Sequence, residues 1–478
     1  MKKGLMTLLL MIIMFPLVWH PSPAHASVNI SDMIMTSLGA TNAGVSIRDS
    51  ETGQILYQFN GNTPRKPAST LKLLTGAATL SLLGEQYRYH TSLYIDGSIS
   101  KGTLNGNVYM KGSGDPTLQY TQLLAFADAL KNKGITKVNG NLYGDERIFS
   151  GSPLTPGIVA EDESDYYAAR TSGLVLSPDN DFDAGTMIVR VAGEKVGQKP
   201  SVSFIPSTMG MTIITNAKTV SSKSMNTITV SRKYRTSEVI ISGNIPAGKW
   251  TQQWVTVNDP TINTVYALKE AMKTQGMTFV ETSAIDRGEI PENATFIATH
   301  ESQTLKEMFP VFMKLSNNSM ADIFVKTLGA EVHGVGDTQT GINVLRDFGQ
   351  TIGLDMSNWT FEDGSGISHN NKVSPNDLTA LLYHVRDMEA YHTYYQALPV
   401  GGNKERLTGG SLRDRYTNAS TKLRVVAKTG ALTGVNTLAG YVKAKSGKTY
   451  IFSIMTENRS APAIDEIDTV VSHLINKY

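Results

Sequence analysis

The segment that most constrains the fold is residues 67–84, where apolar side chains occupy every side of an α-helix. They are Leu71, Leu73, Leu74, Ala77, Ala78, Leu80, Leu82 and Leu83. Pro67 suits a first helical turn, and Gly84 suits the position after the last one. A helix that is apolar all round cannot turn one side to water. The sequence therefore predicts a helix that begins near Pro67 and is buried by other elements.

The length and the lack of cysteine bound the architecture. The chain has 478 residues and no cysteine. This length exceeds what one hydrophobic core normally serves, so we expect two or three domains. Because no disulfide can form, each domain must be stabilised by its own core.

The N-terminus has the pattern of a secretory signal peptide. Lys2 and Lys3 precede an apolar run over residues 5–19, and Ala24-His25-Ala26 is a small-residue cleavage site. A retained membrane anchor is the alternative, but the run is shorter than the roughly 20 residues of a spanning helix, and Pro16 interrupts it. We expect cleavage after Ala26, which leaves no transmembrane anchor.

The charge balance argues against a nucleic-acid partner. Lys and Arg together number 44 against 42 for Asp and Glu, and removal of the leader takes Lys2 and Lys3 away. The mature chain is then neutral, and no basic block stands out in it. Binding to nucleic acid by charge needs a basic surface, so this class of function is not expected.

The pattern of the chain changes along its length. Alternating residues on either side of a turn at 49–53 predict a hairpin over 43–59. From about 89 to 300, short strand-like runs separated by Gly, Pro, Ser and Asn indicate a β-rich insertion. Helical periodicity returns over 305–315, 321–328, 343–352 and 375–385, and a strand pair and a terminal helix follow. Acidic residues on the polar face of that last helix favour core packing over binding to anionic lipid.

Ser69 and Lys72 stand at the start of the predicted buried helix. A serine hydroxyl is a weak nucleophile near neutral pH and needs a neighbouring group that accepts its proton. Residues three apart share a helix face, so the Lys72 amine can reach Ser69, and burial lowers a lysine pKa toward that of a useful base. The spacing alone is weak evidence, because Ser98 and Lys101 share it in a polar turn.

Two further motifs follow in the chain. Ser316-Asn317-Asn318 offers a hydroxyl that can relay a proton and an amide that can hold a substrate, although other Ser-x-Asn triplets occur, as at 27–29, 224–226 and 368–370, and such clusters are ordinarily helix caps or turns. Lys428-Thr429-Gly430 occurs once, on a predicted strand. A cation and a hydroxyl there can bind a carboxylate, and glycine leaves room for a substrate backbone; a solvated strand end is the alternative.

The order of the three motifs is more specific than any one of them. Ser-x-x-Lys, then Ser-x-Asn, then Lys-Thr-Gly is typical of active-site-serine penicillin-recognising enzymes. With these residues in place, the sequence resembles the class C low-molecular-mass penicillin-binding proteins, the D-alanyl-D-alanine carboxypeptidase/endopeptidase family. The resemblance extends to residues 67–70, 112–118, 316–329 and 363–366, and to the long spacer between Ser69 and Ser316.

The resemblance implies an α/β fold of the α+β type. A penicillin-binding, transpeptidase-like domain, with an antiparallel sheet flanked by helices, would comprise residues 27–88 and 300–478 after a signal peptide at 1–26. Two nested β-rich domains would interrupt it. Domain II would comprise 89–185 and 250–299, and domain III would comprise 186–249.

The resemblance also implies a function. It is that of a serine D-Ala-D-Ala carboxypeptidase, with D,D-endopeptidase action also open, which cleaves peptidoglycan stem peptides through an acyl-enzyme and is inhibited by β-lactams. The protein would be extracytoplasmic and associated with the cell wall. Ser69 would attack the carbonyl carbon, Lys72 would take its proton, and Ser316 would pass a proton to the leaving amine.

The substrate-binding residues are implied in the same way. Asn318 would orient the acyl side chain, and Lys428 and Thr429 would hold the terminal carboxylate beside Gly430. Backbone N–H groups of Ser69 and Ala431 would form the oxyanion hole.

A side-chain pocket for diaminopimelate is the last implied feature. It would include Asp145 and Phe149. His369 stands where some members of the family have an arginine, which leaves a carboxylate-binding cation at that position in doubt.

The three motifs are also compatible with two rival functions. A serine β-lactamase shares the three motifs, with Glu331 or Glu362 as candidates for activating water, and a non-catalytic penicillin-binding or wall-binding module would keep the cleft alone. Retention of all the polar motif residues favours an enzyme. No metal or cofactor is expected, because the histidines form no helical pair.

Overall fold

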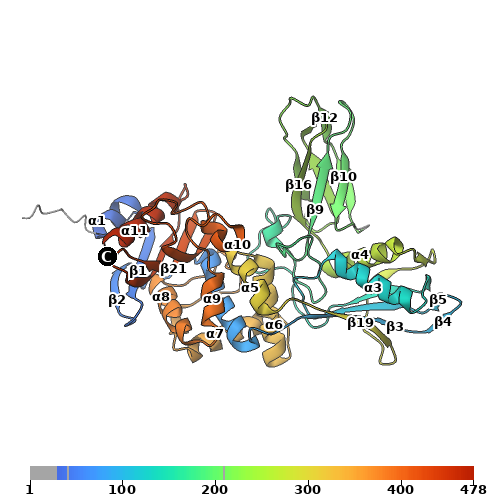
Figure 1. Ribbon diagram of the computed structural model, residues 1–478, viewed down its shortest axis with the longest axis horizontal. Helices are drawn as coiled ribbons and strands as arrows, with labels where there is room; N and C mark the ends of the chain where they lie inside the picture. The colour runs from blue at the N-terminus through green and yellow to red at the C-terminus, as the bar shows by residue number, and fades with distance from the viewer. Residues whose placement is uncertain (1–29, 40–41, 208–209, 478) are drawn as a thin grey trace, which may run out of the picture.

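The computed structural model describes residues 30–39, 42–207 and 210–477, so the predicted signal peptide lies outside the described residues. Three bodies make up the molecule (Figure 1). The first contains both ends of the described chain, the second lies at the opposite end of the long axis, and the third extends sideways from the junction of the other two.

The first body is built on a five-stranded antiparallel sheet in the order β2-β1-β22-β21-β20. The hairpin predicted over 43–59 supplies two of its strands, and its first strand pairs with the last strand of the chain. Both ends of the sequence therefore belong to one sheet. The strands are β1 (Ala43–Asp49), β2 (Ile55–Phe59), β20 (Val425–Leu432), β21 (Val435–Lys443) and β22 (Thr449–Thr456).

Helices cover both faces of this sheet. One face packs against α1 (Ile30–Ser37) and α11 (Ile464–Lys477), in a core that contains Val470 and Phe452. The predicted core packing of the terminal helix is confirmed, except that Ile464 is exposed. The other face packs against α2 (Lys72–Leu83), α5 (Leu305–Lys314), α6 (Asn318–His333), α7 (Thr338–Thr351), α8 (Pro375–His384) and α9 (Tyr391–Ala397).

The predicted buried helix is confirmed, with a different start. It opens as a 3-10 turn, η1 (Ala68–Leu71), and continues as α2, which ends where Gly84 adopts a φ of 83°. Every residue from Lys72 to Leu80 is buried, whereas Leu82 is exposed. The helix contacts α5, α6, α7, α8 and α9, so it is the centre around which this body is assembled.

The second body combines two sheets with two helices. Its sheets have the strand orders β18-β8-β6-β3-β19 and β17-β7-β5-β4. The helices are a departure from the β-rich expectation, and they pack into one core through Leu123, Phe126 and Leu268. The elements are β3 (His90–Ile95), β4 (Ser98–Ser100), β5 (Thr103–Asn105), β6 (Val108–Gly112), α3 (Tyr120–Asn132), β7 (Lys137–Asn139), β8 (Leu142–Asp145), α4 (Pro260–Thr274), β17 (Thr278–Phe279), β18 (Ile285–Arg287) and β19 (Thr295–Glu301).

The third body consists of strands alone within the described residues and has its own small core around Val189, Val239 and Val255. Its strands are β9 (Thr186–Ala192), β10 (Ser201–Ile205), β11 (Thr212–Thr215), β12 (Lys218–Val220), β13 (Thr229–Arg232), β14 (Glu238–Ser242), β15 (Asn244–Pro246) and β16 (Trp250–Thr256). The domain boundaries given above remain a prediction, which the separate cores of the three bodies support.

Candidate active site

Ser69 lies in the 3-10 turn that precedes α2, at the edge of the central sheet. Ala68, immediately before it, has a φ of 47°, which is uncommon for a residue with a side chain. Gly366 packs directly against this turn, and a Cβ at Gly366 would lie 1.9 Å from the Ala68 carbonyl oxygen. The turn that presents Ser69 is therefore held by a close backbone contact with the loop at 363–366.

Lys72 is completely buried and donates to three oxygens. Its Nζ is 3.0 Å from Ser69 Oγ, 2.7 Å from Asn318 Oδ1 and 2.6 Å from the Ser365 carbonyl oxygen. Three acceptors match the three N–H bonds of an ammonium group. They also fix the nitrogen within proton-transfer distance of the serine hydroxyl.

Burial makes Lys72 a stronger candidate for a base. Loss of solvation lowers its pKa to about 8, and the negative charges of Asp322 and Asp363 oppose that shift. An amine with this pKa is neutral in a useful fraction of molecules near neutral pH. Lys72 can therefore take a proton from Ser69, as the sequence predicted.

The Ser-x-Asn motif lies at the beginning of α6. Ser316 has a φ of 62°, and Asn317 caps the helix by accepting from the Met320 N–H at 2.8 Å. Asn317 also donates to the Asp181 and Phe182 carbonyls, at 2.8 and 2.9 Å, which joins the helix start to the second body. The cap fixes the direction of Asn318, whose amide binds Lys72.

Lys428 is buried on β20 and faces the same site. Its Nζ donates to Ser316 Oγ at 2.7 Å and to the Thr429 carbonyl at 2.8 Å. Burial lowers the pKa of Lys428 well below its ordinary value, and the nearby charge of Lys72 lowers it further. The hydroxyls of Thr429 and Ser411 are 2.7 Å apart. The third motif therefore lies within the strand, and not at a solvated strand end.

Gly430 has a different neighbour from the one expected. A Cβ at this position would lie 2.2 Å from Thr437 Oγ1, 2.9 Å from the Pro67 carbonyl oxygen and 3.0 Å from Ala68 Cβ. The space that the missing side chain leaves is occupied by the turn that carries Ser69. Glycine here lets β20 lie against the nucleophile, where we had expected it to make room for substrate.

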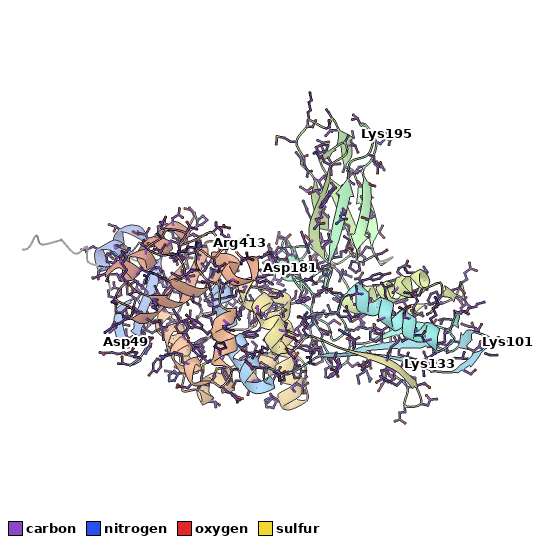
Figure 2. The ribbon with its side chains drawn as sticks, viewed as in Figure 1. Asp49, Lys101, Lys133, Asp181, Lys195 and Arg413 are labelled. Carbon is purple, nitrogen blue, oxygen red and sulfur yellow. The ribbon has the colours of Figure 1, made fainter. Side chains whose placement is uncertain are left out.

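These motifs open into a cavity of about 950 Å³ at the junction of the three bodies. The first body contributes Ser69, Ser316, Asn318, Thr429, Gly430 and Ala431 to its lining. Asp181 comes from the inserted part of the chain and Arg413 from the first body, and Figure 2 shows both near the junction. The structure therefore brings the three motifs together across a spacer of more than two hundred residues.

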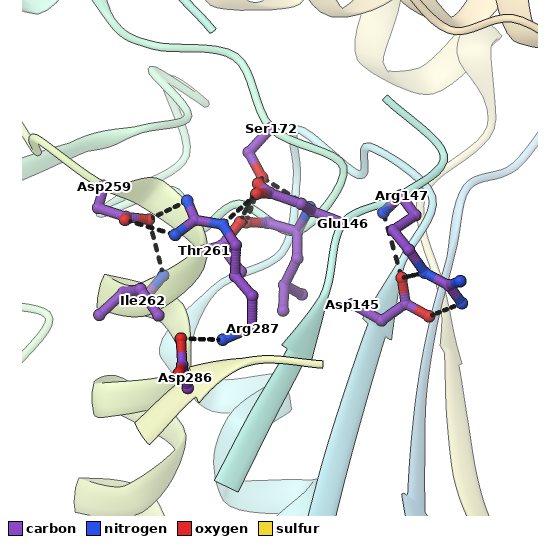
Figure 3. Close-up of polar contacts among 10 residues, drawn as sticks. Asp145, Glu146, Arg147, Ser172, Asp259, Thr261, Ile262, Asp286 and Arg287 are labelled. Atoms are coloured by element: carbon purple, nitrogen blue, oxygen red, sulfur yellow. Dashed lines mark hydrogen bonds and ion pairs between the residues drawn. The ribbon is translucent and has the colours of Figure 1, made fainter. Parts of the chain in front are cut away.

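Asp145 and Phe149 do not line this cavity. Arg147 donates to both carboxylate oxygens of Asp145, at 3.0 Å each (Figure 3). Burial raises the pKa of Asp145, but the hydrogen bonds and charge of Arg147 outweigh it and lower that pKa. Phe149 is buried in the main core and contacts the position of Gly114. The resemblance placed both residues in a side-chain pocket, whereas the structure turns both side chains into packed surroundings.

The inserted part of the chain contributes other residues to the cavity that sequence reasoning missed. They include Asp162, Tyr166, Tyr167, Asp181 and Trp254, and Arg406 lies opposite them. Arg406 forms an ion pair with Asp181 across the junction. No local motif marks these positions, because they come from irregular segments that only the folded chain brings to the site.

His369 lies at the cavity, whereas Glu331 and Glu362 lie away from its lining. His369 lines the cavity, and its Nδ1 is 3.4 Å from Lys66 Nζ, a neighbour that lowers the pKa of the imidazole in addition to burial. Glu331 accepts from Tyr87, and Glu362 accepts from Asn370 at 3.0 Å. Neither glutamate lines the cavity, so neither is positioned to activate water beside Ser69.

The other Ser-x-x-Lys match lies away from the cavity. Ser98 lies in β4 and Lys101 follows it, at the far end of the second body (Figure 2). Across the part of the chain that is described, no three His, Asp or Glu side chains gather as a metal site would require.

The family model of the D-Ala-D-Ala carboxypeptidase 3 (S13) family matches residues 27–477. The chain belongs to this family. An S13 relative, the D-alanyl-D-alanine carboxypeptidase of Actinomadura sp. (strain R39), is 30% identical over 440 residues, which cover 91% of this chain and 81% of the relative. The predicted family is therefore confirmed.

Solved structures share the S13 fold described above. Penicillin-binding protein 4 (dacB) from Haemophilus influenzae is 22% identical, with a TM-score of 0.78 and coverage of 93% of this chain and 98% of that one. The same protein complexed with a β-lactam is 23% identical, with a TM-score of 0.74 and coverage of 94% and 99%. The predicted fold class is confirmed.

Proposed function

We propose that this S13 protein is a serine D-Ala-D-Ala carboxypeptidase that acts on peptidoglycan stem peptides and is acylated by β-lactams. The observation that carries the proposal is the Lys72 amine, completely buried and 3.0 Å from Ser69 Oγ at the base of the cavity. A relative named as such a carboxypeptidase and a related structure complexed with a β-lactam support it.

Acylation begins at Ser69. Its Oγ bonds to the carbonyl carbon of the penultimate D-Ala while its proton moves to neutral Lys72. The oxyanion is stabilised by the backbone N–H groups of Ser69 and Ala431. The C–N bond then breaks, the proton that Lys72 accepted passes by way of Ser316 to the leaving D-Ala amine, and a neutral Lys72 and an ester on Ser69 remain.

Deacylation uses the same base with water as the nucleophile. Water attacks the ester while its proton moves to neutral Lys72, and Lys72 returns that proton to Ser69 Oγ as the C–O bond breaks and the acid product leaves. Ser316 and Lys428 form a proton path of their own, because the Lys428 amine donates to Ser316 Oγ at 2.7 Å. Each serine of the pair therefore has a lysine as its hydrogen-bond partner.

Substrate binding uses the remaining motif residues. Thr429 lies at the wall of the cavity, where its hydroxyl binds the terminal carboxylate. Lys428 is buried behind this wall and acts through its hydrogen bonds to Ser316 Oγ and the Thr429 carbonyl. Asn318 orients the acyl side chain. The cation that the family often has near His369 is supplied in part by Lys66, which lies beside it.

The proposed site of action is outside the cytoplasm. The apolar leader at 5–19 and the small residues at 24–26 support export and cleavage after Ala26. Within the described residues, no helix combines the length and the apolar composition that crossing a membrane requires.

The test is release of D-alanine from diacetyl-lysyl-D-Ala-D-Ala by the purified protein. We expect release by the wild type, none by Ser69→Ala, and unchanged release by Ser98→Ala, which removes the serine of the other Ser-x-x-Lys match. Intact mass after penicillin should show one stable adduct on the wild type. Absence of D-alanine release from the wild type, or hydrolysis of penicillin within seconds, would overturn the proposal.

Endopeptidase action is measured in the same preparation. Cross-linked peptidoglycan dimers are the substrate, and the products are separated by chromatography. Cleavage of dimers without D-alanine release would make endopeptidase the primary activity.

A further inference from the structure

The inserted chain reaches the cavity through an irregular segment, residues 149–167, which we call the wall segment. It lies between β8 and the short turn η2 (Tyr166–Ala168) and contains no helix or strand except the first residues of that turn. Gly157, Val159, Asp162, Tyr166 and Tyr167 all line the cavity. A segment of this kind has no ladder of its own, so its position depends on what holds it.

One face of α6 holds the wall segment at three points. Asn318, Asp322 and Lys326 are four residues apart and so share a face of the helix. Asn318 donates to the Tyr167 carbonyl at 2.9 Å, and Asp322 accepts from Thr155 Oγ1 at 2.7 Å. Going along α6 from Asn318 to Lys326, the bonded residues of the wall segment lie successively closer to β8 in the sequence.

The third contact is made by a buried lysine. Lys326 is 2% exposed, and its Nζ donates to the Ser150 carbonyl at 3.0 Å and to the Ser152 carbonyl at 2.8 Å. The nitrogen also lies 5.9 Å from the centre of the Phe149 ring. A lysine is buried at a cost, which is offset here by two carbonyls of the wall segment, by the ring and by the nearby charges of Asp322, Asp337 and Glu146.

The same face also contacts Lys72 and the loop at 363–366. Asn318 accepts from Lys72, and Asp322 accepts from the Gly364 N–H at 3.3 Å, next to the Ser365 carbonyl that binds Lys72. One helix therefore sets both the distance to the reacting serine and the place of the wall segment.

Other elements also hold the wall segment. The Ser150 N–H donates to the Gly336 carbonyl, the Pro153 carbonyl accepts from Thr171, and buried Glu163 forms ion pairs with Arg170 and Arg232.

We propose that Lys326 and Asp322 are positioning residues that hold the wall segment at the cavity and so determine how well this enzyme binds an extended stem peptide. The inference rests on the proposed function, since it assigns the wall segment to that substrate. A small β-lactam needs only Ser69 and its nearest partners, so its acylation rate depends much less on these contacts. Neither residue touches the reacting atoms; Lys326 acts through the segment, and Asp322 acts through the segment and through its charge, which raises the pKa of Lys72.

The test compares a long and a short acylating ligand on the same variants. Lys326→Met removes the charged donor and keeps the aliphatic stem, and Thr155→Val removes the hydroxyl that binds Asp322. We expect KM for a stem pentapeptide to rise roughly tenfold with kcat within about twofold, while the rate of acylation by benzylpenicillin changes by less than about threefold. Lys326→Arg keeps a charged donor at this position, so its KM for the pentapeptide should lie much closer to the wild-type value than that of Lys326→Met.

Thr327→Val is the matched control for Thr155→Val. Thr327 lies on α6 and is buried, but its hydroxyl bonds to Ile323 and Tyr89, away from the wall segment. This variant should leave the ratio of peptide to penicillin reactivity unchanged. Hydrogen exchange should show faster exchange over 149–167 in Lys326→Met and Thr155→Val only, with β20–β22 unaffected, and this measurement remains valid if activity is lost.

The outcomes separate the two proposals. A wild type that releases no D-alanine contradicts the proposed function. A wild type that is active, with variants whose pentapeptide KM is unchanged or whose peptide and penicillin rates fall equally, contradicts the positioning role alone. Equal exchange over 149–167 in all variants contradicts it as well.

Discussion

The protonation of Lys72 gives the sharpest test of the chemistry. An ordinary lysine, with a pKa of about 10.4, is neutral in only about one molecule in 2,500 at pH 7. Burial lowers the pKa of Lys72 to about 8, so about one molecule in eleven carries the neutral amine at that pH. The environment of the site therefore raises the amount of active base by about 200-fold.

The expected pH dependence follows with a definite sign. Because the base is the deprotonated amine, acylation should accelerate as pH rises, by about tenfold between pH 7 and 9, with a midpoint near 8. The assay is the second-order rate of acylation by a chromogenic β-lactam, measured from pH 6 to 10 in buffers of constant ionic strength.

Lys72→Arg is the matched variant for this experiment. It keeps a cation at the position but cannot lose its proton at these pH values. We expect acylation to fall by about 100-fold to 10,000-fold and to show no rise through pH 8. A flat wild-type profile, a midpoint near 10, or a variant with the wild-type profile would refute the role of Lys72 as base.

Three further predictions concern stability. Gly430→Ala places a Cβ against Thr437 and the Pro67 carbonyl, so the free energy of unfolding should fall by about 1–3 kcal/mol; an unchanged melting temperature would contradict the packing described. Phe309→Ala empties a fully buried site beside α2 and should cost about 3–5 kcal/mol in urea unfolding, and a loss below about 1 kcal/mol would show that the site collapses. Arg406 and Asp181 are 52% and 30% exposed, so a double-mutant cycle should give a coupling of at most about 1 kcal/mol, and a value above about 2 kcal/mol would mean that the junction excludes solvent.

The residues that sequence reasoning placed correctly share a local signature. Ser69 and Lys72 are three residues apart in one turn, and Lys428 is flanked by the apolar residues of a central strand. Such patterns carry their own geometry, because helix and strand periodicities fix which side chains point the same way. The long spacer did not matter, since the motifs at its two ends belong to elements that pack on one sheet.

The residues that it missed depend on contacts between distant segments. The Ser365 carbonyl that binds Lys72 is a main-chain group, and main-chain groups leave no mark in a motif. Asp145 was chosen for the cavity, but its neighbour Arg147 neutralises it, whereas Tyr167 reaches the site from an irregular segment. The helices α3 and α4 were also missed, although Leu123, Phe126 and Leu130 have helical spacing, because the surrounding strands dominated the pattern.

The route of the chain between the first two bodies has an engineering consequence. The chain leaves the first body at Tyr89 and returns at Ser302, and the two residues are hydrogen-bonded to each other, with the Ser302 N–H 2.9 Å from the Tyr89 carbonyl. A short turn could therefore join these two points without moving either end. The shortened protein would keep Ser69, Lys72 and Lys428, and it would lose the wall segment and the packing of Phe149 and Phe182 in the main core. The insertion is thus a substrate-recognition unit that could be replaced by a domain that recognises a different peptide.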